Sequence, residues 1–76
     1  MKDVFIHVFY DGKANTFRLS DYPNADLGEN SNREDIVSFV EQRLDLSSGT
    51  LRSFVVDKTD TNESVNLTVR PSEVFG

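Results

Sequence analysis

The chain has 76 residues, of which 37% are hydrophobic, and it contains no cysteine and one histidine. This length suits one small domain, residues 1–76, built around a single core. The lack of cysteine excludes disulfides and thiolate metal sites, and a single histidine excludes most imidazole chemistry. A net charge of -5 argues against direct binding to nucleic acid or to an anionic membrane, because both need a basic face.

The N-terminal residues carry no basic region followed by a long apolar stretch, so we expect no signal peptide and a cytoplasmic location. The longest apolar run, residues 4–10, is much shorter than the roughly 20 residues that cross a bilayer. We therefore expect no membrane span.

Two strands joined by a tight turn are expected first. Residues 2–10 carry bulky side chains on both faces, which is typical of a central strand. One face holds Val4, Ile6 and Val8, and the other holds Phe5, His7 and Phe9. Residues 11–13 have turn chemistry, and residues 15–19 form a second short strand.

A long polar connection and a helix follow. Residues 20–32 are rich in Asp, Asn, Gly and Ser, which predicts a mobile loop. Ser31 and Glu34 have capping-box spacing, with Asn32 as the alternative cap. A stripe of apolar residues at helical spacing then predicts a helix that residues 47–49 terminate. The stripe comprises Ile36, Val37, Val40 and Leu44, with Phe39 beside it, while Glu34, Glu41 and Arg43 fall elsewhere.

Two further strands complete the order. Residues 52–57 form the third strand and residues 58–63 a polar turn. Residues 64–70 alternate apolar and polar side chains, which predicts a strand with one wet face. Pro71 removes an amide donor and ends this strand, so residues 71–76 are predicted to form a loose C-terminal tail.

One helix with one apolar stripe and one sheet predict a two-layer α+β domain, in which the helix packs on a four-stranded mixed sheet. If the helix joins the second and third strands by a crossover, the first and last strands lie parallel in the middle. This ββαββ order resembles the β-grasp, or ubiquitin-like, fold over the whole chain. The apolar spacing that carries the resemblance comes from Val4, Ile6, Val8, Phe17, Leu19, Ile36, Val40, Leu67 and Val69.

The C-terminal sequence limits what this resemblance implies. Ubiquitin-like proteins that are conjugated or that carry sulfur end in Gly-Gly, whereas this chain ends in Phe75-Gly76. We therefore expect neither conjugation nor sulfur carriage.

Residues 57–67 are similar to the acidic hairpin of Phox-Bem domains, which grips a lysine on the first strand of a partner. The resemblance implies that Asp57, Asp60 and Glu63 form the acidic set and that Lys2 is the matching lysine. The alternative is a solvated, turn-forming hairpin.

Catalysis and metal binding are not expected. His7 lies near Asp3 and Asp11, but residues on or beside one strand share a face without converging on a cleft. The acidic residues 57–63 lack the spacing and the glycine of a calcium loop. No motif for a cofactor is present, so we expect none.

Two surfaces are candidates for a protein partner. If Val4, Ile6 and Val8 meet the helix, then Phe5, His7 and Phe9 lie on the opposite sheet face with Val55, and an exposed apolar patch of this kind marks a contact surface. The alternative is that Tyr22 and Leu27 of the loop, or Val74 and Phe75 of the tail, cover this face. The second surface is the acidic segment, which contains Asp21, Asp26, Glu29, Glu34 and Asp35.

These surfaces give two functional hypotheses. The first is a non-enzymatic protein–protein interaction module that binds a protein partner or a second copy of itself through the sheet face. The second is an acidic inhibitor, of the kind that phages and mobile elements encode, which mimics nucleic acid and blocks a basic partner.

Overall fold

The computed structural model describes residues 3–28 and 30–72. Within them lie four strands and one α-helix: β1 (Asp3–Tyr10), β2 (Lys13–Arg18), α1 (Arg33–Arg43), β3 (Phe54–Asp60) and β4 (Ser64–Pro71). Two short 3-10 turns, η1 (Leu19–Asp21) and η2 (Pro23–Ala25), lie between β2 and α1.

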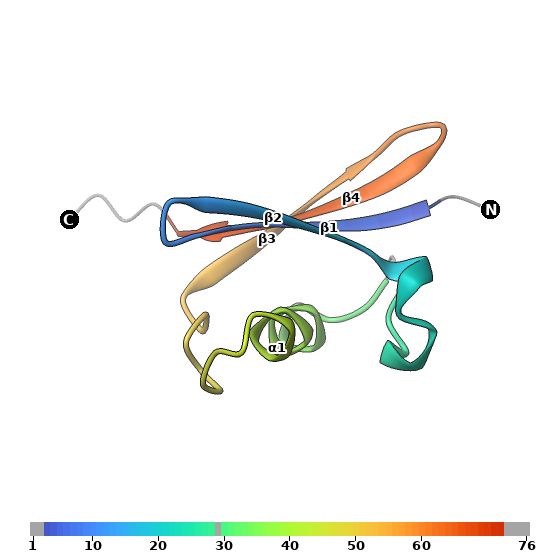
Figure 1. Cartoon of the computed structure of the whole chain (residues 1–76). Helices are drawn as coiled ribbons and strands as arrows, with labels where there is room; N and C mark the ends of the chain where they lie inside the picture. Colours follow the sequence, from blue (N-terminus) through green and yellow to red (C-terminus); the bar gives the residue numbers. More distant parts are fainter. Residues whose placement is uncertain (1–2, 29, 73–76) are drawn as a thin grey trace.

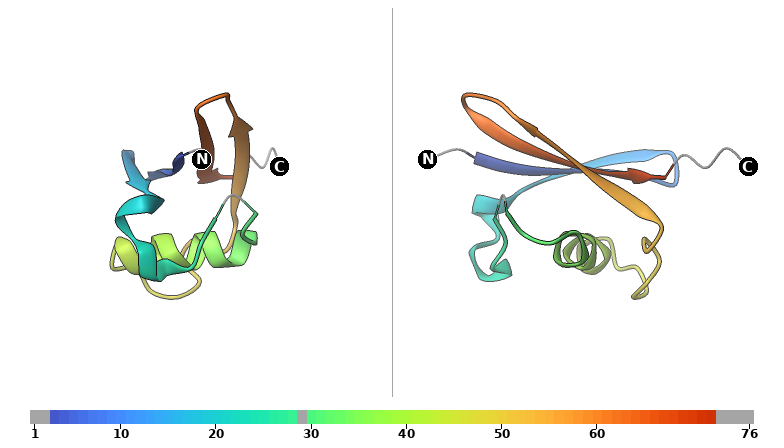
Figure 2. Two further views of the ribbon diagram at one scale, coloured as in Figure 1. Left: turned by 90° about the vertical axis from the view of Figure 1, so that its right-hand side faces the viewer. Right: turned by 180° about the vertical axis from the view of Figure 1, so that it is seen from behind.

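The strands form one mixed sheet in the order β2-β1-β4-β3, and α1 crosses one face of it (Figures 1 and 2). β1 pairs antiparallel with β2 and parallel with β4, while β3 pairs antiparallel with β4. The predicted α+β arrangement, with one helix on a four-stranded mixed sheet, is confirmed. The first and last strands lie parallel in its centre, as expected.

A two-residue turn joins β1 to β2. Asp11 and Gly12 have φ values of 54° and 73°, the two positive values that a type I′ turn requires. Tyr10 is therefore paired with Lys13, and β2 begins two residues before the predicted start. It also ends one residue early, because Leu19 has already entered η1.

The predicted capping box at the start of α1 is wrong. The Ser31 hydroxyl oxygen accepts a hydrogen bond from the Gly28 amide at 2.8 Å, which stabilises the preceding turn instead. Asn32 occupies the N-cap position, but its side chain makes no capping bond. Arg33, the first helical residue, fixes this end of α1 to the sheet, because its Nε donates to the Phe54 carbonyl at 2.9 Å.

α1 ends at Arg43, about one turn before the predicted stop. The Leu46 amide donates to the Glu41 carbonyl at 2.8 Å, the long bond of a Schellman motif. Asp45 supplies the left-handed residue of this motif, with φ of 59°, a conformation that its short polar side chain tolerates. The prediction that residues 47–49 terminate the helix is therefore wrong.

The core lies between α1 and the sheet. Its buried members are Ile6, Val8, Leu19, Ile36, Val37, Phe39, Val40, Leu51, Val65, Leu67 and Val69. The inward faces predicted for the first and last strands are confirmed. Leu51 was not predicted as a core residue, yet it is fully buried, and it comes from the irregular connection between α1 and β3.

Glu41 was expected to lie away from the apolar stripe of the helix, but it is buried, with only 6% of its surface exposed. One of its carboxylate oxygens accepts a hydrogen bond from the Leu51 amide at 2.8 Å. This bond satisfies a buried amide of the connection and also gives the carboxylate a partner. Glu41 of the helix thus holds in place the connecting segment whose Leu51 side chain packs in the core.

The last two strands differ from their predicted bounds. β3 runs over Phe54–Asp60 rather than residues 52–57, so the turn before β4 is shorter than expected. Pro71 is the last residue of β4 and is paired with Phe54, so the predicted tail does not begin at residue 71. Residues 73–76, which make up most of that tail, lie outside the described residues.

The burial of Leu51 yields a test of the core. Leu51→Ala should lower the free energy of unfolding by about 2 to 4 kcal/mol, because the side chain leaves a cavity that the connection cannot fill. Leu27→Ala, which removes the same atoms from a half-buried side chain of the loop, should cost clearly less. Urea denaturation followed by circular dichroism measures both, and equal losses would contradict the assigned role of Leu51.

The Glu41 bond yields a second test. Glu41→Ala should cost about 1 to 3 kcal/mol, because the Leu51 amide would be left buried without an acceptor. Glu41→Gln keeps an oxygen at the same position and should recover much of this loss. If the glutamine variant were as unstable as the alanine variant, the bond would not be the stabilising interaction.

Candidate interaction face

The sheet face that points away from α1 is covered by none of the described segments (Figures 1 and 2). We call it the open face. It comprises Asp3, Phe5, His7 and Phe9 on β1, Ala14, Thr16 and Arg18 on β2, Ser64, Asn66, Thr68 and Arg70 on β4, and Val55, Asp57 and Thr59 on β3.

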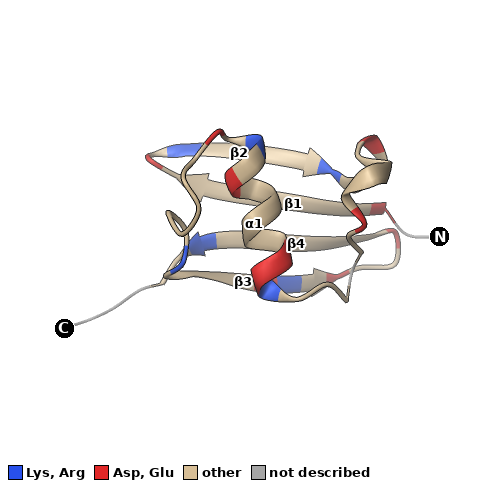
Figure 3. Ribbon diagram, turned by 90° about the horizontal axis from the view of Figure 1, so that it is seen from below, with Lys and Arg blue, Asp and Glu red and all other residues tan. Residues whose placement is uncertain are grey.

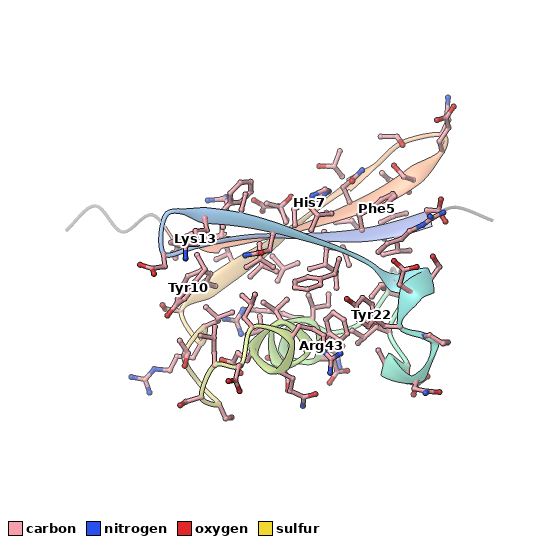
Figure 4. All side chains as sticks on the ribbon, in the orientation of Figure 1. Phe5, His7, Tyr10, Lys13, Tyr22 and Arg43 are labelled. Atoms are coloured by element: carbon pink, nitrogen blue, oxygen red, sulfur yellow. The ribbon has the colours of Figure 1, made fainter. Side chains whose placement is uncertain are left out.

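His7 lies at the centre of the open face, between its neighbours on β2 and β4 (Figure 4). Its Nε2 is 2.8 Å from Oδ1 of Asn66, which can only accept, so Nε2 carries the hydrogen. Its Nδ1 is 3.1 Å from the Thr16 hydroxyl, which donates to it when the imidazole is neutral. The Phe5 ring stacks beside it, with centroids 6.3 Å apart. The imidazole is therefore held in place by three neighbours.

Thr16, His7 and Asn66 have the connectivity of a nucleophile, a base and an orienting group. Their setting does not match that chemistry, because they lie on the surface of a sheet. Two pockets in the described part of the chain lie along α1, and a third at the β1–β2 turn includes Phe9 and Ala14 of the open face, but none of the three is lined by Thr16, His7 or Asn66. The arrangement positions an aromatic surface and offers no enclosed place for a reacting group.

The charges of the open face are paired. Arg18 donates to Asp3 at 3.1 Å, and Arg70 donates to Asp57 at 2.5 Å. All four side chains are about half exposed, so each pair adds little to stability. The pairing nevertheless leaves this face with no net charge, in a chain whose total charge is -5.

One of these pairs also bears on the Phox-Bem resemblance. Asp57 belongs to the expected acidic set, but its carboxylate is held by Arg70 of the same chain. Lys2, the expected matching lysine, lies outside the described residues.

The structure brings Phe5, His7 and Phe9 together on β1 but separates them from Val55, which lies two strands away on β3. Phe9 is 47% exposed and is the one large hydrophobic residue classed as exposed in the described part of the chain. Arg70 is paired with Val55 and stands between that residue and β1. The predicted apolar patch is therefore an aromatic row on β1, with polar side chains on β4 beside it.

The loop between β2 and α1 lies on the helix side, so the described part of it does not cover the open face. Tyr22 packs edge-on against Phe39 and Phe17, with ring centroids 5.3 Å and 6.2 Å away. The Arg43 guanidinium lies over the Tyr22 ring at 5.5 Å from its centroid (Figure 4). This cluster explains why part of the predicted mobile loop adopts two 3-10 turns.

The acidic residues of the loop also lie on the helix side. Figure 3 shows Asp and Glu on the segment between β2 and α1 and on α1 itself. Asp21 and Asp26 are exposed, and Asp26 lines a shallow pocket together with Asp35. Glu29, the third acidic residue predicted to bind a partner, lies outside the described residues. The two predicted contact surfaces therefore occupy opposite layers of the molecule.

Within residues 3–28 and 30–72, no three metal-ligating side chains gather in one place, and no helix is long and apolar enough to cross a membrane. Comparisons of the chain with protein-family models, with curated proteins and with solved structures return no match.

The polar partners of His7 could not be predicted from sequence patterns. The alternation of β1 placed His7 on the open face, but its partner Asn66 is 59 residues away in the chain. The only signal was the polar side of the last strand, which carries Asn66 and Thr68 opposite its apolar side.

The Tyr22 cluster yields a test of what orders the loop between β2 and α1. Tyr22→Ala should accelerate amide hydrogen exchange at Ala25, whose amide donates to the Tyr22 carbonyl, because the ring contacts that hold the turn are lost. Exchange within β1 and β4 should not change. Tyr10→Ala is the matched control, since the Tyr10 ring contacts Phe54 rather than the loop. Unchanged exchange at Ala25 in the Tyr22 variant would mean that the backbone alone orders the turn.

Proposed function

We propose that this chain is a non-enzymatic, cytoplasmic protein–protein interaction module of the β-grasp (ubiquitin-like) type, and that it binds its partner through the open face. The observation that carries the proposal is a sheet face that is aromatic, uncharged overall and left uncovered by the described segments, in a chain that is otherwise strongly acidic.

The β-grasp assignment is supported by topology. The first and last strands lie parallel in the centre of the sheet, and α1 connects β2 to β3 across one face. This is the arrangement that the ubiquitin-like resemblance of the sequence implies.

The composition of the face suits a protein partner. Phe5 and Phe9 provide aromatic anchors of the kind that dominate binding energy at interfaces. The polar groups around them already have partners within the chain: Asn66 binds His7, and each carboxylate binds an arginine. A partner can therefore cover the face without burying an unpaired charge, which is the main penalty for burying ions.

The second candidate function, the acidic inhibitor, uses the other layer. Its support is the exposure of Asp21 and Asp26 on the helix side, away from the paired charges of the open face. A basic partner bound there would leave Phe9 uncovered. The two functions therefore require different surfaces, so mutations can separate them.

A capture experiment with two double variants tests the proposal. The bait is the immobilised chain, and the sample is a lysate of its native host. Phe5→Ser with Phe9→Ser should abolish capture of a specific protein, whereas Asp21→Asn with Asp26→Asn should leave it unchanged. Binding should also persist as salt is raised, because an aromatic contact is screened little.

The opposite pattern would favour the acidic inhibitor: capture lost in the asparagine variant, retained in the serine variant, and weakened steeply by salt. Circular dichroism of each variant serves as the control for folding. The proposal expects the serine variant to remain folded, because Phe5 and Phe9 point away from the core.

A further inference from the structure

We propose that the open face binds a second copy of this chain, sheet on sheet, about a two-fold axis that runs parallel to β1 and β4 and passes between them. This inference rests on the proposed function and names the partner. An axis in this position places β1 of each copy over β4 of the other, and β2 over β3.

The distribution of large and small side chains across the open face favours this axis. β1 presents Phe5, His7 and Phe9, whereas β4 presents the smaller Ser64, Asn66 and Thr68 along most of its length and the large Arg70 only near its C-terminal end. The sheet thus has a ridge along one central strand and a shallow trough along the other. The axis lays the ridge of each copy in the trough of its mate, which is the interdigitation that face-to-face sheets need at a spacing of about 10 Å.

The residues that this axis places opposite each other also suit one another. An axis parallel to the strands pairs each residue with one at the same level along the strands of the second copy. Ala14 is level with Phe9, and Val55 is level with Arg70. Since Val8 is level with Val69, Phe9 and Arg70 are level too. The axis therefore brings Ala14 over the second copy's Val55, and Phe9 over its Arg70, a cation–π contact.

The charges of the two outer strands also favour this axis. On the open face, β2 carries Arg18 and β3 carries Asp57, so placing β2 over β3 opposes positive and negative side chains twice in the dimer. Arg18 is level with Thr59, two residues or about 7 Å along the strand from Asp57, which is within the reach of an arginine side chain.

An axis perpendicular to the strands fits worse. It would place β1 over β1 and β4 over β4, with the Phe5 ring of one copy against the Phe9 ring of the other. The aromatic side chains of the two β1 strands would then collide, and the smaller side chains of the two β4 strands would leave a gap between them. It would also set β2 against β2 in opposite directions, so that Arg18 of one copy faces Ala14 of the other rather than an opposing carboxylate.

The size of the face sets the expected strength. Four strands about 4.8 Å apart and about 20 Å long cover roughly 400 Å² on each copy. Stable interfaces bury about 800 Å² on each partner. The dimer should therefore be weak, and it should form in the range from micromolar to millimolar protein.

Analytical ultracentrifugation across that range tests self-association. The chain should shift reversibly from monomer to dimer. Phe9→Ser should weaken the dimer at least tenfold, because each dimer loses two anchors, while Gln42→Ser on the exposed side of α1 should change nothing. A chain that stays monomeric up to millimolar concentration, or a dimer that is insensitive to Phe9→Ser, would overturn the inference.

The absence of native cysteine allows the geometry to be tested directly. Ala14→Cys mixed with Val55→Cys should give a cross-linked heterodimer with a short bismaleimide, while either variant alone should not. Cross-linking of Ala14→Cys with itself would indicate β2 over β2 and would overturn the axis. Cross-linking should also disappear when Phe9→Ser is added to both chains.

The two proposals fail separately. If the chain stays monomeric but captures another protein through Phe5 and Phe9, the second-copy inference is wrong and the proposed interaction function stands. If neither dimerisation nor capture of another protein depends on Phe5 and Phe9, both proposals are wrong.

Discussion

The parallel pairing of β1 with β4 is the constraint on which the rest of this structure depends. Parallel neighbours cannot be joined by a tight turn, so the chain between them must leave the sheet and return. It does so as a β-hairpin, a loop, one helix and a second hairpin, with α1 on a single face. One helix can bury only one face of the sheet. Within the described part of the chain the open face is thus a direct result of the topology, and its aromatic row lies on β1, one of the two central strands.

The helix layer is held to the sheet by a few polar bonds as well as by the core. Arg33 binds the Phe54 carbonyl at one end of α1, and Glu41 binds the Leu51 amide further along. Both bonds reach the irregular connection and the start of β3. The Tyr22 cluster closes the other side of the helix against β2. Side chains of α1 therefore order the segments on both of its flanks, which carry little regular structure themselves.

Sequence patterns predicted the elements of the fold better than their ends or their neighbours. The alternation of Val65, Leu67 and Val69 fixed the inner face of β4, because period-two patterns depend on one strand only. The end of α1 was missed, since Asp45 takes the left-handed conformation more often found at glycine. At the site, alternation placed Phe9 and His7 on the outer face. The polar groups beside them come from distant strands, whose register a single sequence does not reveal.

The strand order also bears on how the protein is made. The Asp11-Gly12 turn lets β1 and β2 pair as soon as both are synthesised, because their contacts are local. The other edge of β1 stays unpaired until β4, the last strand of the sheet in the sequence, has been synthesised. Until then an apolar strand with an open hydrogen-bonding edge is exposed on the nascent chain, a condition that favours association with other chains. Because Val65, Leu67 and Val69 of β4 belong to the core, the core cannot close until this last strand has left the ribosome.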